Sequence, residues 1–553
     1  MQTKHITSDF SVAAQIGVDD LPELAAQGIK TIVCNRPDGE AADQPAFAEI
    51  EKAAAAAGMT CHYVPVSGAV TRENIAEFKA ALSDAQRPVL AYCRSGTRCA
   101  TLWALSELGQ RPQEEIASKT LAAGYDVRAA LDHAAATSSP TDASPAARHD
   151  IVIIGGGAAG GAVAASLLRR NHNLDIAIID PADTHYYQPG WTMVGGGIFD
   201  AASTAKPMAT ALPQGITRIK AAVTGFDPDN NTVGIEGGKI IRYNHLIVCP
   251  GIKLNWDGIE GLASTLGKNG VTSNYRYDLA PYTWELVRTL KSGRALFTQP
   301  AMPIKCAGAP QKAMYLSADH WRRTGNLGKF EVEFYSPGGV LFSVPEYVPA
   351  LMQYVERYNA ALKFSHNLVA VDGPGKTAIF KKTDSNGNVE NVETRFDMIH
   401  VTPPQTAPDF IRSSPLADAG GWVDVDPATL RHKKYRNIFG LGDAINAPNA
   451  KTAAAARKQA PVVAENVLYD KGQRPSQCAY DGYGACPLTV ERGRIVLAEF
   501  TYGGKVAPSL PHLIDGTKAT RAAWFLKARL LPPIYWNAML KGREWLVKPR
   551  AMG

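Results

Sequence analysis

Short apolar runs separated by alanine-rich amphipathic segments recur along residues 1–132, and this pattern predicts a small α/β unit. The runs at residues 29–34 and 88–92 are typical of buried strands, and helical segments lie between them. Residues 133–149 lose the periodic pattern and contain two prolines. They predict a linker between this unit and the rest of the chain.

Alternating strands and helices resume on a larger scale at residue 150 and continue to about residue 504. The first elements are an apolar run at residues 150–154, a helical segment at 161–170 and a second apolar run at 176–180. This order is typical of a parallel sheet of the Rossmann type. We therefore expect residues 150–504 to form the main α/β body of the protein.

The pattern changes again in residues 505–553, which carry a net charge of +7 in a chain whose total is +6. Within residues 521–548, Trp, Tyr, Phe and Leu are interleaved with Lys and Arg, and Pro532 and Pro533 are expected to split two amphipathic helices. Apolar faces flanked by cations suit helices lying among lipid headgroups, where quinones dissolve. Packing on the domain's own core or on a second copy of the chain, as a homodimer, is the alternative.

Composition narrows the class of protein. A length of 553 residues predicts about three domains, and 45% hydrophobic residues suffice for folded cores. Eight cysteines are too few for a disulfide scaffold, and the first ten residues contain no apolar signal segment, so we expect a reducing compartment. No run of 18 apolar residues is present, which argues against a membrane-spanning helix. We expect no nucleic-acid partner and no metal.

A glycine-rich turn follows the strand at residues 150–154. Gly155 permits the tight turn, Gly157 lets the backbone approach a pyrophosphate, and Gly160 allows the helix to pack on the strand. Asp180, 20 residues after Gly160, ends the second strand, where a carboxylate can accept a hydrogen bond from a ribose hydroxyl. Together these features predict a dinucleotide site.

A second signature resembles that of flavoproteins with two dinucleotide domains. The strand after Arg436 ends in Gly442-Asp443, and in those proteins this places a carboxylate beside the ribityl chain of FAD. Gly251, after a further apolar strand, is expected to belong to the same cofactor site, and a surface turn is the alternative for Asp443. The second G-x-G-x-x-G that binds NAD(P)H in such proteins is missing from residues 293–310, where a cysteine stands instead.

Cys306 and Cys486 lie 180 residues apart in distinctive local sequences. These sequences resemble the sulfide:quinone oxidoreductases, in particular the two-cysteine branch that includes the mitochondrial enzyme. The resemblance covers about residues 150–545 and rests on residues 185–192, 304–312, 400–404, 452–455 and 485–488. It implies FAD bound by two Rossmann-type subdomains, sulfide as electron donor and a membrane quinone as acceptor.

The same resemblance implies how the cysteines react. Hydrosulfide would attack a disulfide or trisulfide between Cys306 and Cys486, leaving a persulfide on Cys486 and a flavin-facing thiolate on Cys306. Lys312 and Lys451 would lower a thiolate pKa or stabilise the reduced flavin. A low-molecular-weight thiol or sulfite is the expected sulfur acceptor. The alternative for Cys306 and Cys486 is that both are buried, inert thiols. We expect Cys249 to be such a thiol. A reactive Cys249 is the minor alternative, because a three-cysteine branch of the family exists.

Cys93 follows the strand at residues 88–92 and precedes a helical segment at 99–108. Successive backbone N–H groups, the helix dipole and Arg98 would hold it as a thiolate. Tyrosine-type phosphatases have a C-x5-R loop, whereas Arg98 is only five positions after Cys93. The shorter C-R-x-G-x-R loop resembles rhodanese. Residues 28–40 resemble a phosphatase-like family that is often fused to enzymes of sulfur metabolism. Cys99 beside the loop would resolve a persulfide or be buried in the helix.

We therefore expect a phosphatase-like fold with rhodanese-like sulfurtransferase chemistry at Cys93 and Arg98. It would be fused to a sulfide:quinone oxidoreductase bound peripherally at the cytoplasmic face of the membrane. The first unit would relay the sulfane sulfur that the flavoprotein produces. Two alternatives remain. One is an NADH-quinone reductase of the same fold, which the missing second fingerprint disfavours; the other is a signalling phosphatase or inert sensing module at the N-terminus.

Overall fold

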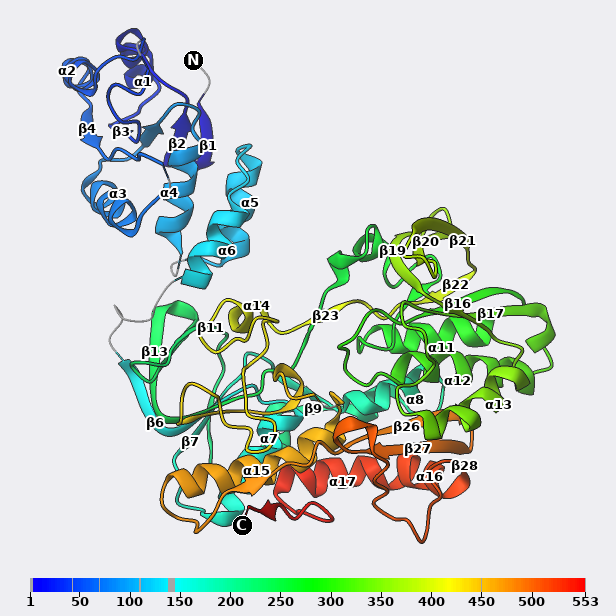
Figure 1. Ribbon diagram of the computed structural model, residues 1–553. Helices are drawn as coiled ribbons and strands as arrows, with labels where there is room; N and C mark the ends of the chain where they lie inside the picture. Colours follow the sequence, from blue (N-terminus) through cyan, green and yellow to red (C-terminus); the bar gives the residue numbers. More distant parts are fainter. Residues whose placement is uncertain are drawn as a thin grey trace. The chain divides into compact units, whose positions relative to one another are not determined.

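The chain divides into two units in the computed structural model, the first formed by residues 1–143 with 235–239 and the second by the remainder (Figure 1). The structure describes residues 3–41, 43–68, 70–108, 111–137, 145–448 and 450–552. Helix α6 (Arg128–Thr137) ends and strand β6 (Pro145–Ile154) begins inside the range 133–149 predicted to be a linker. Residues 138–144 of that range lie outside the described residues.

A five-stranded sheet forms the first unit, in the order β1-β2-β5-β3-β4. Strand β1 is antiparallel to β2, and the other neighbours are parallel. Successive residues of a strand point to opposite faces, so β3 and β5 contribute to one apolar core on each side of the sheet. The α/β prediction for this unit is confirmed. The elements are β1 (Lys4–Thr7), β2 (Phe10–Ala13), α1 (Leu21–Ala26), β3 (Thr31–Cys34), α2 (Phe47–Ala56), β4 (Thr60–Tyr63), α3 (Arg72–Asp84), β5 (Val89–Tyr92), α4 (Thr97–Glu107) and α5 (Gln113–Ala122).

The first sheet of the second unit runs in the order β10-β7-β6-β13-β12-β11, and β24 pairs with the end of β13. Its pairs β10/β7, β7/β6, β6/β13 and β13/β24 are parallel, as expected for a Rossmann-type sheet. Helices α7 and α15 pack against each other beside it. The elements are α7 (Ala158–Arg170), β7 (Ile176–Ile179), β10 (Thr217–Ile219), β11 (Val223–Asp227), β12 (Thr232–Ile235), β13 (Lys239–Val248), β24 (Ile438–Gly440) and α15 (Ala453–Asp470).

A second parallel sheet, in the order β15-β22-β16-β17-β18, confirms the prediction of two Rossmann-type subdomains. The chain enters and leaves this subdomain through the antiparallel pair β14 and β23. The elements are β14 (Lys253–Leu254), β15 (Val271–Thr272), α11 (Leu279–Thr289), β16 (Gly293–Thr298), α12 (Ala309–Arg323), β17 (Phe330–Ser336), α13 (Val348–Arg357), β18 (Ala361–Phe364), β19 (His366–Asp372), β20 (Thr377–Thr383), β21 (Val389–Arg395), β22 (Met398–His400) and β23 (Gln405–Thr406).

A small antiparallel sheet of β26 (Gly484–Glu491), β27 (Arg494–Phe500) and β28 (Ala519–Thr520) lies beyond the two Rossmann-type sheets in sequence. Strand β26 contacts helix α12 of the second subdomain, and both elements are labelled in Figure 1. Two segments that are far apart in sequence therefore lie side by side. Shorter elements are β8 (Thr184–Tyr186), α8 (Trp191–Gly195), β9 (Ala205–Pro207), α9 (Met208–Ala211), α10 (Leu262–Thr265), α14 (Asp409–Arg412), β25 (Cys478–Ala479) and β29 (Arg550–Ala551).

The C-terminal segment is not split at Pro532 and Pro533, so that prediction is wrong. Helix α16 (Arg521–Phe525), a π-helical turn (Leu526–Leu530) and α17 (Leu531–Asn537) follow one another directly. Both prolines lie in the first turn of α17, where a missing N–H disrupts a helix least.

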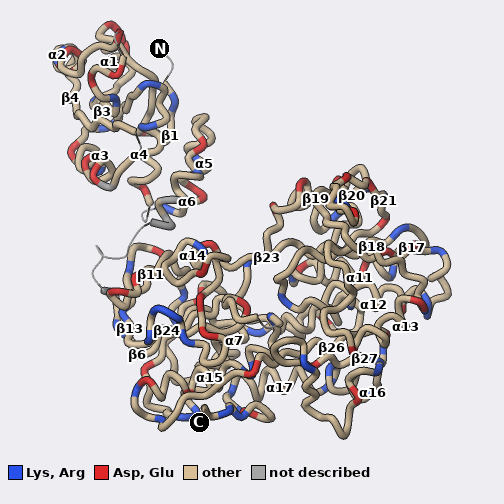
Figure 2. The backbone as a smooth tube through the Cα atoms, viewed as in Figure 1, with Lys and Arg blue, Asp and Glu red and all other residues tan. Residues whose placement is uncertain are grey.

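Part of this segment packs on its own unit, as the alternative interpretation required. Tyr535, Trp536, Met539 and Leu540 are buried, and the Tyr535 hydroxyl is 2.6 Å from His185 Nε2. Exposed apolar side chains remain at Phe525, Leu530, Trp545 and Leu546. Basic residues, blue in Figure 2, recur near this end of the chain.

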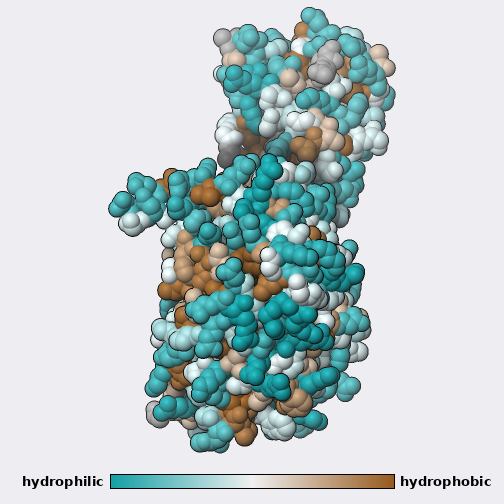
Figure 3. Space-filling model, turned by 90° about the vertical axis from the view of Figure 1, so that its right-hand side faces the viewer, coloured by the Kyte–Doolittle hydropathy of each residue, from teal (hydrophilic) through white to brown (hydrophobic). Residues whose placement is uncertain are grey.

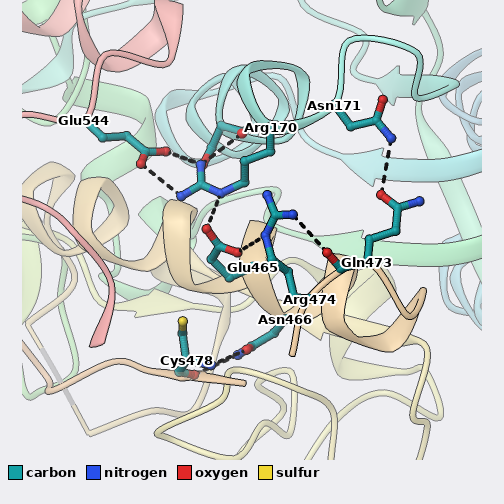
Figure 4. Close-up of polar contacts among 9 residues, drawn as sticks. Arg170, Asn171, Glu465, Asn466, Gln473, Arg474, Cys478 and Glu544 are labelled. Carbon is teal, nitrogen blue, oxygen red and sulfur yellow. Dashed lines mark hydrogen bonds and ion pairs between the residues drawn. The ribbon is translucent and has the colours of Figure 1, made fainter. Parts of the chain in front are cut away.

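A buried ion-pair network ties the C-terminal segment to the Rossmann helix α7 (Figure 4). Arg170 donates hydrogen bonds to both carboxylate oxygens of Glu544, at 2.6 and 3.0 Å, and to Glu465 at 2.7 Å. Ser166 donates to Glu544 at 2.6 Å. Because the three charged side chains are largely shielded from water, this network is stronger than a surface ion pair.

None of the described helices is long and apolar enough to cross a membrane. The face of the molecule drawn in Figure 3 is largely hydrophilic, with separate hydrophobic patches.

Candidate active sites

Cys306 and Cys486 lie together, with their sulfur atoms 3.5 Å apart. Cys306 is in the loop before α12, and Cys486 is near the start of β26, so the contact between these two elements brings the pair together. Cys486 is 2% exposed, and Cys306 is half-buried. Both thiols are free, and a disulfide would require the sulfurs to approach by about 1.5 Å.

The backbone of Cys306 has a φ of +51°, a left-handed conformation that is uncommon for a residue with a side chain. Its N–H donates to the Lys451 carbonyl at 2.9 Å, and its carbonyl accepts from the Ala309 N–H at 2.7 Å. These two bonds hold the residue in a conformation that costs about 1–3 kcal/mol elsewhere. Such over-determined strain is typical of a functional residue.

The two thiols have opposite tendencies to ionise. A hydrogen bond from Cys486 and the ammonium group of Lys312, whose Nζ is 3.2 Å from the sulfur, hold the pKa of Cys306 well below its usual range. The same hydrogen bond and burial raise the pKa of Cys486. Burial opposes the charge on Lys312, but the two sulfurs raise its pKa. Ionisation of the pair therefore favours Cys306, which accepts a hydrogen bond from the Cys486 thiol.

Gly308 keeps the cysteines close. A Cβ atom at this position would lie 2.6 Å from the Cys486 sulfur and 2.6 Å from Leu488 Cδ2. The φ of Gly308 is −86°, so the restriction is steric and does not come from the backbone conformation. Any side chain here must push β26 away from α12.

The family resemblance implies that sulfide reduces a bound flavin, and we expect Gly308→Ala to lower the rate of that reduction by at least about tenfold, because the added methyl displaces Cys486 from Cys306. The measurement is stopped-flow absorbance of the oxidised flavin after mixing with sulfide. Gly328→Ala is the matched control, because a Cβ there meets nothing within 4 Å. Equal rates in the two variants would contradict the steric role of Gly308.

Polar groups from several elements surround the Cys306 loop. The Tyr275 hydroxyl donates to the Lys305 carbonyl at 3.0 Å, and Gln405 accepts from the Lys305 N–H at 2.8 Å. The Lys305 ammonium donates to Gln188 at 2.6 Å. Among the described residues, Gln405 Nε2 and Trp191 Nε1 are buried without a hydrogen-bonding partner. Buried donors of this kind are available to the polar edge of a bound cofactor.

Lys527 is a site residue that the sequence analysis missed. It comes from the π-helical turn of the C-terminal segment, is 3% exposed and donates to the Pro189 carbonyl at 2.8 Å. Burial, reinforced by the charge of Lys312, lowers its pKa to about 7. Its charge in turn helps to lower the pKa of Cys306. The sequence signal for this burial is that Lys527 is four residues from Ala523, which places both on the same buried face of a helix.

We expect Lys527→Met to stabilise the fold and to slow the sulfide oxidation that the family resemblance implies. A buried lysine whose pKa is lowered in the folded state destabilises the fold most at pH values below that lowered pKa, where it must carry its charge while buried. This destabilisation decreases as the pH rises and disappears only above the pKa of the unfolded state, about 10.4. The gain in unfolding free energy should therefore be on the order of 2 kcal/mol at or below pH 7 and should shrink towards pH 10. Thermal melts across this range, with exposed Lys518→Met as control, test the prediction. A Lys527→Met protein that melts below the wild type at pH 6 would contradict it.

The glycine turn has the geometry that a dinucleotide cradle requires. Gly155 has a φ of +98°, and a Cβ on Gly160 would lie 1.8 Å from the Gly155 carbonyl oxygen, so α7 packs directly on the turn. A Cβ on Gly157 would meet nothing within 4 Å, which leaves space in front of the helix N-terminus. Gly251 has a φ of +87° and equally open surroundings. The residues present therefore fit a pyrophosphate.

Asp180 follows β7 and the Gly442-Asp443 turn follows β24, two parallel strands of one sheet that are separated by β6 and β13. Asp180 accepts from the Gly156 N–H at 2.6 Å, a contact within the cradle that the sequence did not predict. Gly442 has a φ of +77°, and its N–H donates to Gln459 at 2.7 Å. Burial raises the pKa of Asp443, opposed by the charges of Lys451 and Lys305.

The side chain of Lys451 does not point at a sulfur, so of the two roles expected for it only stabilisation of the reduced flavin stays a prediction. Its ammonium donates to the carbonyls of Asp443 and Ile445, at 2.8 and 2.7 Å, and lies 4.0 Å from the centre of the Trp422 ring. Burial lowers its pKa to about 8. Lys451 contacts Cys306 through its backbone carbonyl only, so Lys312 is the lysine on the thiolate.

Cys249 is buried, as expected, with its sulfur 3.8 Å from the Gly155 carbonyl oxygen. Burial raises its pKa, so it is an inert thiol packed under the glycine turn. Among the described residues, no group of three or more His, Cys, Asp or Glu side chains is placed to hold a metal ion.

Cys93 of the first unit ends β5 and begins the loop that leads into α4. The Gly96 N–H donates to its sulfur at 3.1 Å. A hydrogen bond from the Cys99 thiol and the backbone N–H groups of Ser95, Cys99 and Arg98 lower its pKa to about 5, although burial opposes this. Cys93 is therefore a thiolate at neutral pH, and its side chain is fully buried beneath the loop.

Arg98 supports this thiolate through its backbone rather than its side chain, contrary to expectation. Its guanidinium donates to the Val66 carbonyl at 2.8 Å and to Glu40 at 2.6 Å. Glu40 also accepts from Arg36 Nε at 2.7 Å. The loop is thus a cradle of backbone N–H groups with an ion cluster beside it.

Comparisons with known proteins agree with the geometry of the second unit. Residues 149–305 match the pyridine nucleotide-disulphide oxidoreductase family model, in agreement with the two Rossmann-type sheets. The sulfide:quinone oxidoreductase from Aquifex aeolicus shares this fold, with a TM-score of 0.59 over 72% of this chain and 92% of that chain at 20% identity. The mitochondrial sulfide:quinone oxidoreductase of Dictyostelium discoideum is 44% identical over 376 residues, 68% of this chain and 81% of the relative. The chain belongs to the sulfide:quinone oxidoreductase family.

The first unit has a different relationship. Residues 2–110 match the phosphatase-like domain of beta-lactamase hydrolase-like proteins. The beta-lactamase hydrolase-like protein of Agrobacterium fabrum is 38% identical over 133 residues, which are 24% of this chain and 31% of the relative. The predicted phosphatase-like fold and the fusion are confirmed. The rhodanese-like chemistry at Cys93 stays a prediction.

Proposed function

We propose that this chain oxidises sulfide, holds the sulfur on Cys486 and delivers two electrons to a membrane quinone. The observation that supports this most directly is the Cys306 and Cys486 pair, 3.5 Å apart with Lys312 on one sulfur. Family membership supports the same activity. A thiolate and a thiol in contact are the reduced form of a centre that exchanges sulfur.

The steps on the protein balance as thiol exchange. Hydrosulfide attacks the Cys486 sulfur of the oxidised pair, a new S–S bond forms there, and the bond to Cys306 breaks. Cys306 leaves as a thiolate, which the ammonium of Lys312 at 3.2 Å stabilises. The sulfide sulfur is oxidised by two electrons, and the pair is reduced by two. Thiol or sulfite then attacks the outer sulfur of the Cys486 persulfide and removes it.

Restoring the oxidised pair requires a two-electron acceptor, and FAD, when bound, supplies this and passes the electrons to quinone. Gly155, Gly157 and Gly160 would hold its pyrophosphate, because they form the open cradle at the N-terminus of α7. The same end of this parallel sheet carries Asp180 after β7, Gly251 after β13 and Gly442 with Asp443 after β24. Lys451 fixes the turn that carries Asp443.

Anaerobic addition of sulfide to the purified holoprotein tests the activity. The oxidised flavin absorbance should disappear with sulfide and return with quinone, and NADH should have little effect. Rapid bleaching by NADH but not by sulfide would instead support an NADH-quinone reductase.

We also propose that the C-terminal segment rests on a membrane surface, from which quinone reaches the flavin. Phe525, Leu530, Trp545 and Leu546 are 41% to 71% exposed and lie among Arg521, Arg529, Arg543 and Lys548. Exposed apolar groups surrounded by cations suit an anionic lipid surface.

Replacing Phe525 and Leu530 with Glu should weaken binding to vesicles that contain anionic lipids by at least about tenfold, because both apolar contact and charge attraction are lost. Co-sedimentation with vesicles measures this. Val340 and Val389, 63% and 60% exposed on the other Rossmann-type subdomain, are replaced with Glu as control. Unchanged sedimentation of the Phe525 and Leu530 variant would refute the membrane assignment.

For the first unit, we propose sulfur transfer at Cys93. Its thiolate would attack the outer sulfur of a persulfide, so that one S–S bond forms, the donor's S–S bond breaks and the donor leaves as a thiolate. The pKa of about 5 supports a nucleophile that is ionised at neutral pH. Sulfane transfer from glutathione persulfide should be lost in Cys93→Ser. Hydrolysis of phosphate esters without such transfer would favour a phosphatase.

A further inference from the structure

An ion cluster of Glu40, Arg36 and Arg98 stands beside the Cys93 loop. Each carboxylate oxygen of Glu40 accepts from a different arginine, Oε2 from Arg36 at 2.7 Å and Oε1 from Arg98 at 2.6 Å. Arg36 is further held by Gln15 at 2.8 Å, and Arg98 by the Val66 carbonyl at 2.8 Å. Neither arginine is therefore directed at the sulfur.

The cluster lies close to the sulfur. The backbone N–H of Arg98 donates to the Cys93 thiolate, so the guanidinium lies no farther from the sulfur than one hydrogen bond plus the length of an arginine side chain. The side chain of Arg36 is 7% exposed, and those of Arg98 and Glu40 are 21% and 29% exposed. Partial burial weakens screening by water, so the charges of the cluster act on an anion at the loop.

Charge counting then separates two classes of ligand. Two arginines would attract a tetrahedral dianion such as a phosphate ester, but Glu40 leaves the cluster with a net charge of +1. A dianion at the loop would also face the Cys93 thiolate and the Glu40 carboxylate at short range. A persulfide carries one negative charge or none, so it meets much less repulsion.

From this we infer that Glu40 determines specificity at the Cys93 loop by excluding dianionic oxyanions in favour of small monoanionic sulfur donors. The inference rests on the proposed sulfur transfer for the identity of the favoured ligand. Its electrostatic part concerns anion binding alone and holds independently of any transfer.

Protection of Cys93 from iodoacetamide in the full-length protein tests it, with alkylation of the Cys93 peptide quantified by mass spectrometry. Tungstate is the dianionic probe, and perrhenate is a monoanion of the same tetrahedral shape. Glu40→Gln should bind tungstate about tenfold more tightly than the wild type, with a smaller change for perrhenate. Arg36→Gln should bind tungstate more weakly.

Glu114→Gln is the matched control, because it breaks an exposed pair with Arg128 in the same unit and should leave protection unchanged. Equal losses of tungstate protection in Glu40→Gln and Arg36→Gln would show that the cluster is only structural and would overturn the inference. An equal gain in affinity for tungstate and perrhenate in Glu40→Gln would also overturn the inference. If Glu40→Gln binds tungstate more tightly as expected but the wild type transfers no sulfane sulfur, only the proposed function of the unit fails.

Discussion

Cys306→Ser and Cys486→Ser should each abolish the bleaching of the flavin by sulfide, with at least about a thousandfold loss of sulfide-dependent quinone reduction. Serine cannot form the S–S bond through which the pair accepts sulfur, and the two sulfurs act as one unit at 3.5 Å. Anaerobic titration with sulfide, followed by the absorbance of the oxidised flavin, gives the measurement directly.

Cys478→Ala provides the control for the loss of a buried thiol. Cys478 is 8% exposed, and it is held in place by backbone hydrogen bonds with Asn466 rather than by its sulfur (Figure 4). We expect this variant to bleach at the wild-type rate. If both serine variants were reduced by sulfide as fast as Cys478→Ala, the mechanism would be wrong.

Lys312→Met should raise the pKa of Cys306 and slow its alkylation by iodoacetamide at pH 7 by about 10- to 100-fold in the reduced protein. The thiolate exists above the pKa, and Lys312 lowers that pKa from 3.2 Å, so its removal moves the rise in reactivity to higher pH. The rate should recover as the pH is raised. Sulfide oxidation at pH 7 should fall with it, because Cys306 becomes a poorer leaving group.

Lys312→Arg keeps the positive charge and is the conservative comparison. We expect its alkylation profile to stay near that of the wild type. A pH profile of Lys312→Met that overlies the wild-type profile would show that the lysine does not control ionisation of Cys306.

Features formed by one continuous segment could be predicted from the local sequence alone. The G-x-G-x-x-G turn predicted a tight turn at Gly155 and close packing at Gly160, because these properties depend on a single strand, turn and helix. Strands β3 and β5 were predicted for the same reason. The proximity of Cys306 and Cys486 needed the family resemblance, since their spacing of 180 residues carries no geometric information.

Side-chain direction could not be predicted in the same way. Arg98 lies in the Cys93 loop and Lys451 directly precedes a segment that carries the family resemblance, yet both side chains bind carbonyl groups. Lys527 was counted among cations of a lipid-facing surface, whereas the π-helical turn directs it inward. A single extra residue per turn changes which face a side chain occupies, and apolar periodicity does not report it.

Phe525 and Lys527 are two positions apart, yet one is 56% exposed and the other 3% exposed. This short stretch of helix thus places an apolar side chain at the surface and directs the Lys527 ammonium toward Cys306. Inserting or deleting one residue here would rotate everything beyond it by about 100° around the helix axis. The proposed membrane contact and the proposed catalytic charge therefore depend on the same helical register. We expect this segment to tolerate changes of composition far better than changes of length.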